Sequence, residues 1–274
     1  ALSNEAFESI GAMPGYKILE NPTSTGFYIK LNSQLAPTDD VHIRKAIALA
    51  MDYDTIREVI YPGSPMNGPL ASTFADAYLD TLPPQQFDME AAAAEVAQSG
   101  YADKGLIKLN MSWVAGLGFE EEIALMFKSN LDSIGFDVTL QPEPWNRITE
   151  LAASPETTPN ATQVFSGASY PSPDAIFYVQ YHSAAKGSWA SMEWTENPEI
   201  DSLIDAARST TNVDEQNGYY KELQQKLVDL QSDVFVLVEN KRHAVNACLQ
   251  GHEWVPMQSW EYDFANYWWD CAAK

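Results

Sequence analysis

The residues that could carry out acid–base chemistry form no recognisable constellation in this chain. Glu120, Glu121 and Glu122 are adjacent, but neighbouring residues of a helix point in different directions, so the triplet makes no acid/base pair. Glu143 is a further isolated carboxylate. A solvated face at a helix start, where carboxylates favour the positive end of the helix dipole, accounts for the triplet.

The remaining candidates for catalysis or metal binding lead to the same result. The four histidines show neither H-x-x-x-H nor H-E-x-x-H spacing: His42, His182, His243 and His252. Ser166 and Gly167 lack the rest of a nucleophile-elbow motif. The sequence therefore predicts no enzyme, no metal site and no cofactor.

Cys248 and Cys271 are the only cysteines. Their spacing matches no zinc or redox motif, which leaves a disulfide or two unpaired thiols. A disulfide fits an exported protein, because oxidising compartments preserve such bonds.

Aromatic residues favour a binding protein. The chain has eight tryptophans and 13 tyrosines, and amphipathic rings suit a ligand cleft because they combine flat apolar area with a polar tip. We expect the tryptophans near the C-terminus to fill a core. Trp113 differs, since it ends a predicted strand ahead of a glycine-containing loop, where open α/β sheets present residues to a ligand.

Composition excludes several other classes of function. The 274 residues carry 38 acidic and 16 basic side chains, a net charge of -22. Nucleic acid and anionic membrane surfaces are poor partners for such a chain, because neutralising phosphates needs a basic face. No apolar run is long enough to span a membrane. The first residues also lack the charged and apolar regions of a signal segment.

An amphipathic helix is predicted near the start of the chain. Its apolar residues recur at the spacing that places them on one face: Ile43, Ala46, Ile47, Ala50 and Met51. Arg44 and Lys45 fall off that face. Asp40 precedes the helix, where a carboxylate accepts bonds from free backbone N–H groups. The alternating segment 26–32 predicts a half-buried strand.

The middle of the chain alternates strands and helices. Segments 106–114 and 136–140 have strand patterns, and the helical pattern 119–134 lies between them. A helical crossover of this length implies a parallel strand pair, so we predict an α/β fold. An apolar strand at 234–238 has the length of a central strand.

Several motifs occur in order along the chain. They are DDVHIRKAIALAMDYD at 39–54, FDMEAAAAEVAQSGY at 87–101, GASYPSPD at 167–174, NPEIDSLI at 197–204 and YKELQQKL at 220–227. This order resembles the family 5 extracellular solute-binding proteins, the peptide, nickel and glycan receptors of ABC importers. Asp88 is the predicted N-cap of a helix within 87–101. The chain departs from the family pattern at Glu95, where the family has a leucine.

The resemblance implies the C-terminal lobe of a two-lobed periplasmic-binding-protein-like fold, type II and cluster C-like, with a mixed sheet flanked by helices. Family members are longer, so we interpret the chain as a C-terminal portion. Residues 1–26 would end the first lobe and cross over, 27–251 would form the α/β lobe, and 252–274 would return toward the first lobe. Apolar surface near Trp260 and Trp268 is then expected to be exposed.

The resemblance also implies ligand-binding residues. In peptide-binding relatives, the acid of G-x-D-Y accepts the charged α-amino group of the ligand. The loop that begins at Gly167 has Ser169 at that position, beside Tyr170. Asp174 follows five residues later and could supply the charge, although a cap on the following helix is the stronger interpretation. Asn32, at the end of a strand, and Trp113, through its flat face, complete the candidate set.

The implied function is the substrate-binding component of an ABC importer. We expect a periplasmic or extracellular, membrane-associated monomer that captures a small polar solute or oligomer between its lobes and delivers it to a membrane permease. Because Ser169 lacks a charge, the ligand is predicted to be an oligosaccharide or sugar conjugate ahead of a peptide. The missing N-terminal lobe would complete the cleft. The alternative is an extracytoplasmic sensory or scaffolding domain without a transport role.

Overall fold

The structure is a computed structural model that describes residues 4–254 and 264–271. Its strands are β1 (Tyr16–Leu31), β2 (Gly63–Pro65), β3 (Ile107–Val114), β4 (Phe136–Glu143), β5 (Ala161–Ser166), β6 (Asp233–Asn246), β7 (Leu249–Gln250) and β8 (Trp268–Trp269). The first six form one mixed sheet in the order β2-β6-β1-β5-β3-β4, and β7 pairs with β8. The predicted parallel pair is confirmed, because β3 and β4 run parallel in register from Ile107 and Phe136.

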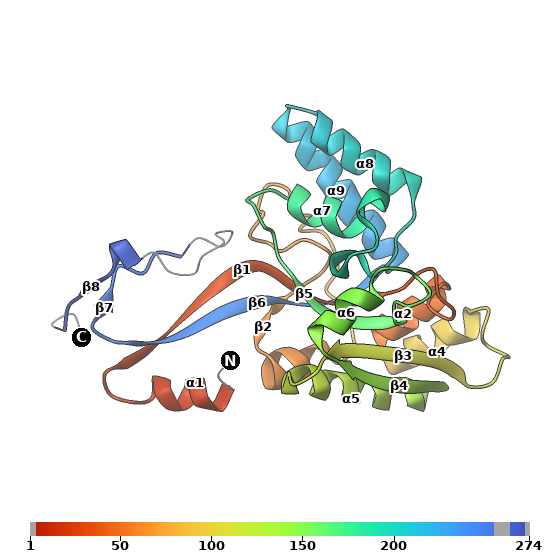
Figure 1. Ribbon diagram of the computed structural model, residues 1–274, viewed down its shortest axis with the longest axis horizontal. Coiled ribbons are helices and arrows are strands. Elements are labelled where there is room, and N and C mark those ends of the chain that lie inside the picture. The colour runs from red at the N-terminus through yellow and green to blue at the C-terminus, as the bar shows by residue number, and fades with distance from the viewer. Residues whose placement is uncertain (1–3, 255–263, 272–274) are drawn as a thin grey trace.

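Helices cover both faces of the sheet. They are α1 (Asn4–Gly11), α2 (Val41–Leu49), α3 (Tyr53–Thr55), α4 (Met89–Gln98), α5 (Gly118–Ser133), α6 (Trp145–Leu151), α7 (Asp174–Tyr181), α8 (Pro198–Ser209) and α9 (Val213–Leu230). Four short helical turns of other types accompany them in the described residues: η1 (Ile56–Ile60), η2 (Ser183–Ala185), η3 (Trp189–Ser191) and η4 (Phe264–Asn266). Helix α3 runs directly into η1. Helices α7 to α9 rise on one side, and α2, α4 and α5 lie on the other (Figure 1). This arrangement confirms the predicted α/β class with a mixed, helix-flanked sheet.

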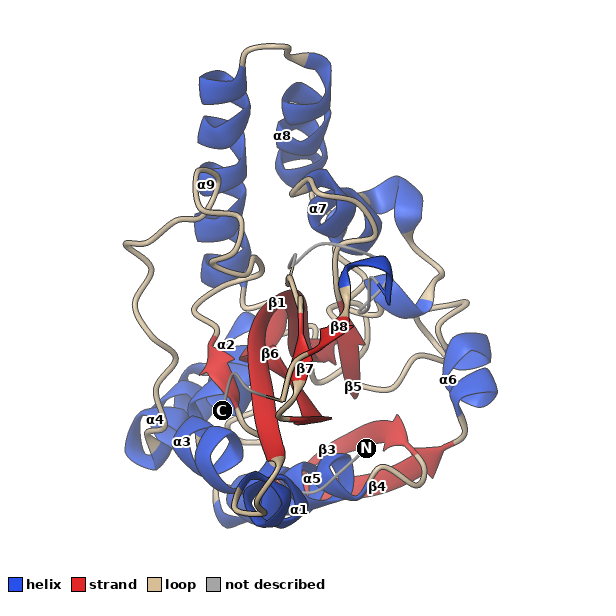
Figure 2. Ribbon diagram, turned by 90° about the vertical axis from the view of Figure 1, so that its left-hand side faces the viewer, coloured by secondary structure: helices blue, strands red, loops and turns tan. Residues whose placement is uncertain are grey.

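Strands β1 and β6 extend beyond the sheet as a two-stranded ribbon. From Gly26 onward β1 lies between β6 and β5 in the sheet. Its first part, Tyr16–Pro22, pairs only with Asn240–Asn246, and the register shifts between Pro22 and Gly26. The small unit of α1, β7 and β8 lies at the far end of this ribbon (Figures 1 and 2). The division of the chain at 26/27 and 251/252 stays a prediction.

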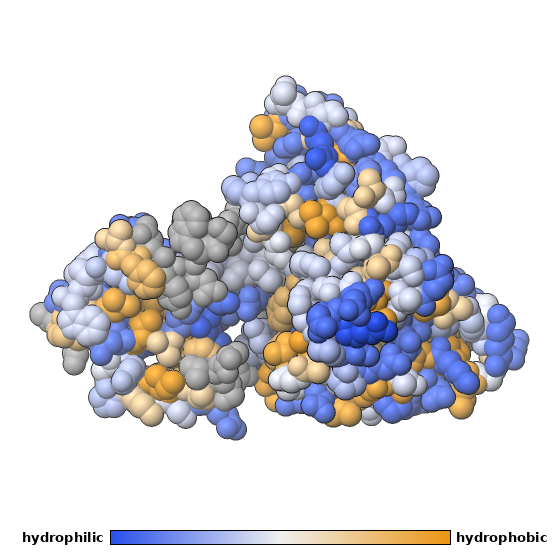
Figure 3. Space-filling model, viewed as in Figure 1, coloured by the Kyte–Doolittle hydropathy of each residue, from blue (hydrophilic) through white to orange (hydrophobic). Residues whose placement is uncertain are grey.

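Strand alternation divides the apolar side chains between two faces. Phe27, Ile29 and Leu31 of β1 enter a core with α2 and α5 residues such as Ile47 and Phe127. The opposite face packs against α6 and the loops beneath α7 to α9. Hydrophilic residues cover most of the visible outer face of the main body, interrupted by scattered hydrophobic ones (Figure 3).

Two predicted helix starts are confirmed. The Asp40 side chain accepts a hydrogen bond from the His42 backbone N–H at the start of α2. The Asp88 side chain accepts one from Ala91 N–H at the start of α4. Each carboxylate satisfies a backbone donor that has no partner within its helix.

Arg44 corrects the sequence prediction, because it is buried rather than off the packed face of α2. Its guanidinium donates hydrogen bonds to the backbone carbonyls of Leu230 and Gln231 after α9, at 2.7 to 3.1 Å. It also donates to Thr38 and Asp39 carbonyls before α2. These contacts satisfy helix-end carbonyls that would otherwise be buried without donors.

A second buried cation lies on the opposite face of the sheet. Lys30 Nζ lies 3.1 Å from Glu193 Oε2 and 3.4 Å from Asp233 Oδ1, and all three side chains are fully buried. Lys30 Nζ also donates to Gln180 Oε1 at 2.7 Å, and the Tyr181 hydroxyl donates to Asp233 Oδ2 at 2.6 Å. The cluster joins β1, β6, α7 and the loop after η3.

Two carboxyl groups share one ammonium group in this cluster. Burial raises the pKa of Glu193 to about 8 and raises the pKa of Asp233, while Lys30 opposes both shifts. One carboxyl group therefore retains its proton at neutral pH. That proton leaves the buried cluster without net charge.

Replacing Arg44 with methionine in the full-length protein should lower the free energy of unfolding by roughly 2–4 kcal/mol. The apolar side chain fills similar space but leaves buried carbonyl groups without donors. Urea unfolding measures the change, with Lys45→Met at the neighbouring, half-buried position as the matched control. Equal stability of the two variants would contradict the role assigned to Arg44.

The Glu193 cluster predicts a pH dependence of stability. Burial raises the pKa of Glu193 from its ordinary value of 4.5 to about 8 in the folded protein. Between these two pH values, the folded state therefore binds more protons than the unfolded state. The free energy of unfolding should therefore fall as the pH rises from about 4.5 to about 8. Glu193→Gln should flatten this slope and Glu156→Gln, at an exposed glutamate, should not. Thermal unfolding across pH 5 to 8.5 tests this, and an unchanged slope in Glu193→Gln would refute it.

Candidate functional site

The carboxyl ends of three strands gather at one end of the sheet. Strands β3, β4 and β5 run parallel, and Ser166 at the end of β5 pairs with Gly26 of β1. That position is where β1 and β6 leave the sheet as the ribbon (Figure 1). We call the segments that follow these strands the carboxyl edge: residues 115–117, 144–145 and 167–174.

The loop after β5 carries most of the predicted ligand-binding residues. An added Cβ on Gly167 would lie 2.5 Å from Thr25 Oγ1, so only glycine fits beside β1. Ser169 is exposed, and Tyr170 is 44% exposed. The structure therefore brings Gly167, Ser169 and Tyr170 together at the carboxyl edge.

Asp174 is already engaged by neighbouring side chains. Its Oδ2 accepts a 2.5 Å hydrogen bond from the Tyr170 hydroxyl, and its Oδ1 lies 3.6 Å from Arg208 Nε. The Arg208 guanidinium in turn lies 3.8 Å from the centre of the Tyr178 ring. Pro173 is the N-cap of α7 and Asp174 is its first residue, so Asp174 is not at the predicted capping position. The Tyr170 hydroxyl and the Arg208 guanidinium of α8 thus offset the charge of Asp174.

Tyr170 remains a neutral donor across the physiological pH range. Burial and the hydrogen bond to Asp174 raise the pKa of Tyr170 to about 12, while Arg208 opposes the shift. The loop offers hydroxyl groups and backbone, and its one carboxylate faces a guanidinium.

Two predicted ligand-binding residues lie elsewhere. Trp113 is 4% exposed within the core shared with α2 and α5, because β3 is an inner strand covered by helices. Asn32 is fully buried at the opposite end of β1, where its Nδ2 donates to the Pro155 and Thr158 carbonyls. Neither side chain has a surface open to a ligand, so these two assignments are wrong for the described lobe.

Glu120 also differs from its predicted solvated position. It is 1% exposed at the start of α5, and its Oε2 accepts a 2.8 Å hydrogen bond from the Val114 backbone N–H. Burial raises the pKa of Glu120 to about 7. Its backbone carbonyl accepts a bond from Gln163 Nε2. Glu120 thus connects the start of α5 to the end of β3. Glu121 and Glu122 are exposed.

Sequence reasoning missed an aromatic pair at the carboxyl edge. The rings of Trp145 and Trp189 meet edge to face with centroids 5.4 Å apart. Trp145 is 43% exposed at the start of α6. The signal was a tryptophan directly after Pro144 and five residues beyond the predicted strand 136–140, which the helical pattern of the following residues obscured.

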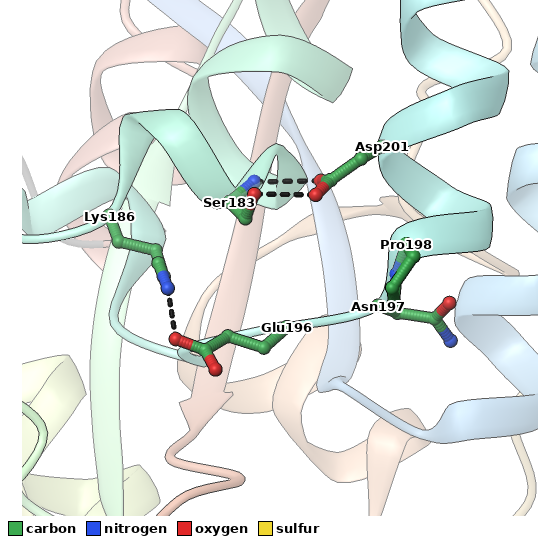
Figure 4. Close-up of a pocket in the computed structure, with 6 residues that line it drawn as sticks. All are labelled: Ser183, Lys186, Glu196, Asn197, Pro198 and Asp201. Carbon is green, nitrogen blue, oxygen red and sulfur yellow. Dashed lines mark hydrogen bonds and ion pairs between the residues drawn. The ribbon is translucent and has the colours of Figure 1, made fainter.

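A surface hollow of about 310 Å³ lies beyond the far end of α7. Figure 4 shows that its polar side chains bind one another. Ser183 donates to Asp201 from both its backbone N–H and its hydroxyl group, at 2.8 and 2.5 Å, and Lys186 pairs with Glu196. The serine proton goes to a carboxylate instead of a histidine, so the hollow does not build an activated nucleophile.

The described residues contain no group of three or more potential metal ligands from His, Cys, Asp and Glu. Within those same residues, no helix is both long and apolar enough to cross a membrane.

Cys248 and Cys271 form a disulfide whose Cα atoms lie 4.4 Å apart. It links the start of β7 to the segment after β8. Trp268 beside it is 59% exposed, and Trp260 lies outside the described residues.

Comparison with known proteins places the chain among bacterial solute receptors. Residues 2–188 match the family described as "Bacterial extracellular solute-binding proteins, family 5 Middle". The oligopeptide-binding protein AppA of Bacillus subtilis is 24% identical over 266 residues, which cover 92% of this chain and 48% of AppA. A probable D,D-dipeptide-binding periplasmic protein of Escherichia coli, DdpA, is 22% identical over 253 residues, with 88% and 46% covered.

Solved structures share the fold. AppA from Bacillus subtilis, in complex with a nonapeptide, superposes with a TM-score of 0.81 at 20% identity, covering 96% of this chain and 54% of AppA. DppA from Helicobacter pylori, in complex with the peptide STSA, gives a TM-score of 0.83 at 17% identity, with 96% and 50% covered. The chain spans about half the length of these relatives. It belongs to family 5 of the bacterial extracellular solute-binding proteins.

Proposed function

We propose that the full-length protein is the substrate-binding component of an ABC importer, which captures a polar solute and delivers it to a membrane permease. The observation that carries the proposal is the position of the carboxyl edge. It lies where β1 and β6 leave the sheet toward the small unit. A solute bound there would lie between this lobe and whatever the ribbon leads to.

The ribbon suits hinge closure. The register of β1 against β6 shifts between Pro22 and Gly26, and the Thr23 hydroxyl bonds the Glu239 carbonyl across the shift. Hinges are a few residues at element boundaries that absorb backbone rotation. A ligand that contacts both lobes has higher affinity for the closed state and therefore populates it. The permease would recognise that closed state.

The boundaries and location follow from the same proposal. Residues 27–251 would form one lobe, and residues 1–26 and 252–274 would belong with the other lobe. The described disulfide fits a protein outside the cytoplasm, where oxidising conditions preserve such bonds. The protein would act there as a monomer.

The ligand is proposed to be polar and held without a charged amino anchor in this loop. Ser169 cannot supply a charge, and the Asp174 carboxylate already faces Tyr170 and Arg208. A buried ammonium group without a carboxylate costs several kcal/mol, so a free peptide amino terminus is poorly held here. An oligosaccharide or sugar conjugate fits these neutral groups. Peptides are the second candidate, since AppA and DdpA are named for peptide ligands.

Calorimetry on the full-length protein tests the ligand class. A thermal-shift screen of oligosaccharides and tripeptides first identifies the solutes that bind. Acetylating the amino terminus of any peptide that binds should change its affinity by less than about threefold, because the loop offers that terminus no free carboxylate. Tight peptide binding that vanishes on acetylation would show the inference from Ser169 to be wrong.

The Ser169 hydroxyl should contribute directly to affinity. Ser169→Ala removes a neutral donor and acceptor, which is expected to weaken solute binding by roughly 0.5–1.5 kcal/mol. Ser202→Ala on α8 is the matched control, because Ser202 is also exposed and bonds only the Pro198 carbonyl in its own helix. Equal affinities of the two variants would remove Ser169 from the site.

A further inference from the structure

Trp145 and Trp189 form an aromatic pair that is not part of the loop after β5. Their ring planes meet at 62° with centroids 5.4 Å apart, an edge-to-face geometry that stabilises aromatic pairs. Trp189 begins η3 and is half-buried. Trp145 is 43% exposed even with this contact. One indole thus holds the other in place while part of the second stays open to solvent.

The strand register places Trp145 level with the loop that carries Tyr170. Val114 of β3 pairs with Glu143 of β4, and Ser112 pairs with Thr162 of β5. Continuing the β3–β4 register by two residues and the β3–β5 register by four sets Trp145 at the level of Ser166. Only β3 separates β4 from β5, so two strand spacings set a minimum separation of about 10 Å between the two positions.

The surface between these two positions contains two glycines and the partly exposed side chain of Leu117. The loop after β3 contains Gly116, and Gly118 follows at the start of α5. An added Cβ at either glycine would meet no atom within 4 Å. The space beside these two glycines is therefore open. A ligand of roughly three extended units, at 3.3–3.6 Å each, would reach from Trp145 to the loop after β5.

We propose that Trp145, held by Trp189, is a stacking platform for a flat apolar face of the solute. The shared chemistry is the C–H face of a sugar ring or the planar face of an aromatic side chain. Polar groups of the same solute would bond Ser169 and Tyr170 in the loop after β5. This inference rests on the proposed solute-binding function and assigns its second subsite.

The test uses the full-length protein and four probes: cellotriose, maltotriose, and the capped peptides Ac-Ala-Tyr-Ala-NH₂ and Ac-Ala-Ala-Ala-NH₂. Calorimetry compares the wild type with Trp145→Ala, Trp145→Phe and Leu106→Ala. Leu106 is the matched control, because it is 67% exposed and precedes β3 at the opposite end of the sheet. Circular dichroism and thermal unfolding verify that each variant folds.

The probe that binds should lose at least about tenfold in affinity in Trp145→Ala, because stacking on an indole is lost. Trp145→Phe should retain most of the affinity, since it keeps a flat ring, and Leu106→Ala should match the wild type. Loss confined to a trisaccharide identifies a sugar ring as the partner. A preference for the tyrosine peptide over the alanine peptide that disappears in Trp145→Ala identifies an aromatic side chain.

The possible failures are distinguishable. If a probe binds and Trp145→Ala leaves its affinity within twofold, the platform is refuted and the proposed function stands. If no probe binds the wild type, the proposed polar-solute function fails, and the platform fails with it. If Leu106→Ala weakens binding as much as Trp145→Ala, the effect is not local to the carboxyl edge and the platform is likewise refuted.

Discussion

The pairing of β1 with β6 is the constraint on which the rest of the structure depends. These strands of 16 and 14 residues are the longest in the described chain. Their inner halves form the centre of the sheet, and their outer halves form the ribbon to the small unit. The hydrogen bonds between β1 and β6 therefore build both the centre of the sheet and the ribbon that begins beside the carboxyl edge. A change of register by one residue would exchange the two faces of β1 and disrupt both cores.

Two buried cations fix the helical layers against this sheet, although the chain as a whole is strongly acidic. Arg44 connects the start of α2 to the carbonyls that end α9. Lys30 connects β1 to α7 and to the loop after η3 through Gln180 and Glu193. Each cation has several oxygen partners. Buried charges persist where such partners replace the lost water, and removing one partner leaves the others uncompensated.

The carboxyl edge combines neutral polar groups with flat apolar area. The loop after β5 retains a glycine fitted against Thr25 and an exposed tyrosine. Ser169 is exposed in this loop, and Asp174 is paired with Arg208. The exposed indole of Trp145 adds flat apolar area at the same end of the sheet. The proposed preference for a solute held by neutral hydrogen bonds and stacking rests on these features together.

The sequence by itself determined the local elements, the α/β class and the family. Apolar spacing located α2 and α5, Asp40 and Asp88 marked helix starts, and the strand–helix–strand order required β3 and β4 to be parallel. Such signals are local, because each depends on residues within one or two turns or on the length of one connection.

Only the tertiary structure decided which polar groups are buried and which aromatic rings are open. Helical spacing placed Arg44 and Glu120 on outer faces, yet Arg44 meets carbonyls 186 residues away and Glu120 meets the end of β3. Trp113 lies in the core because helices cover its strand, and Trp145 is exposed beside Trp189, 44 positions further along the chain. These outcomes depend on contacts between segments far apart in sequence, and the periodicity of one segment carries no information about the segment that packs against it.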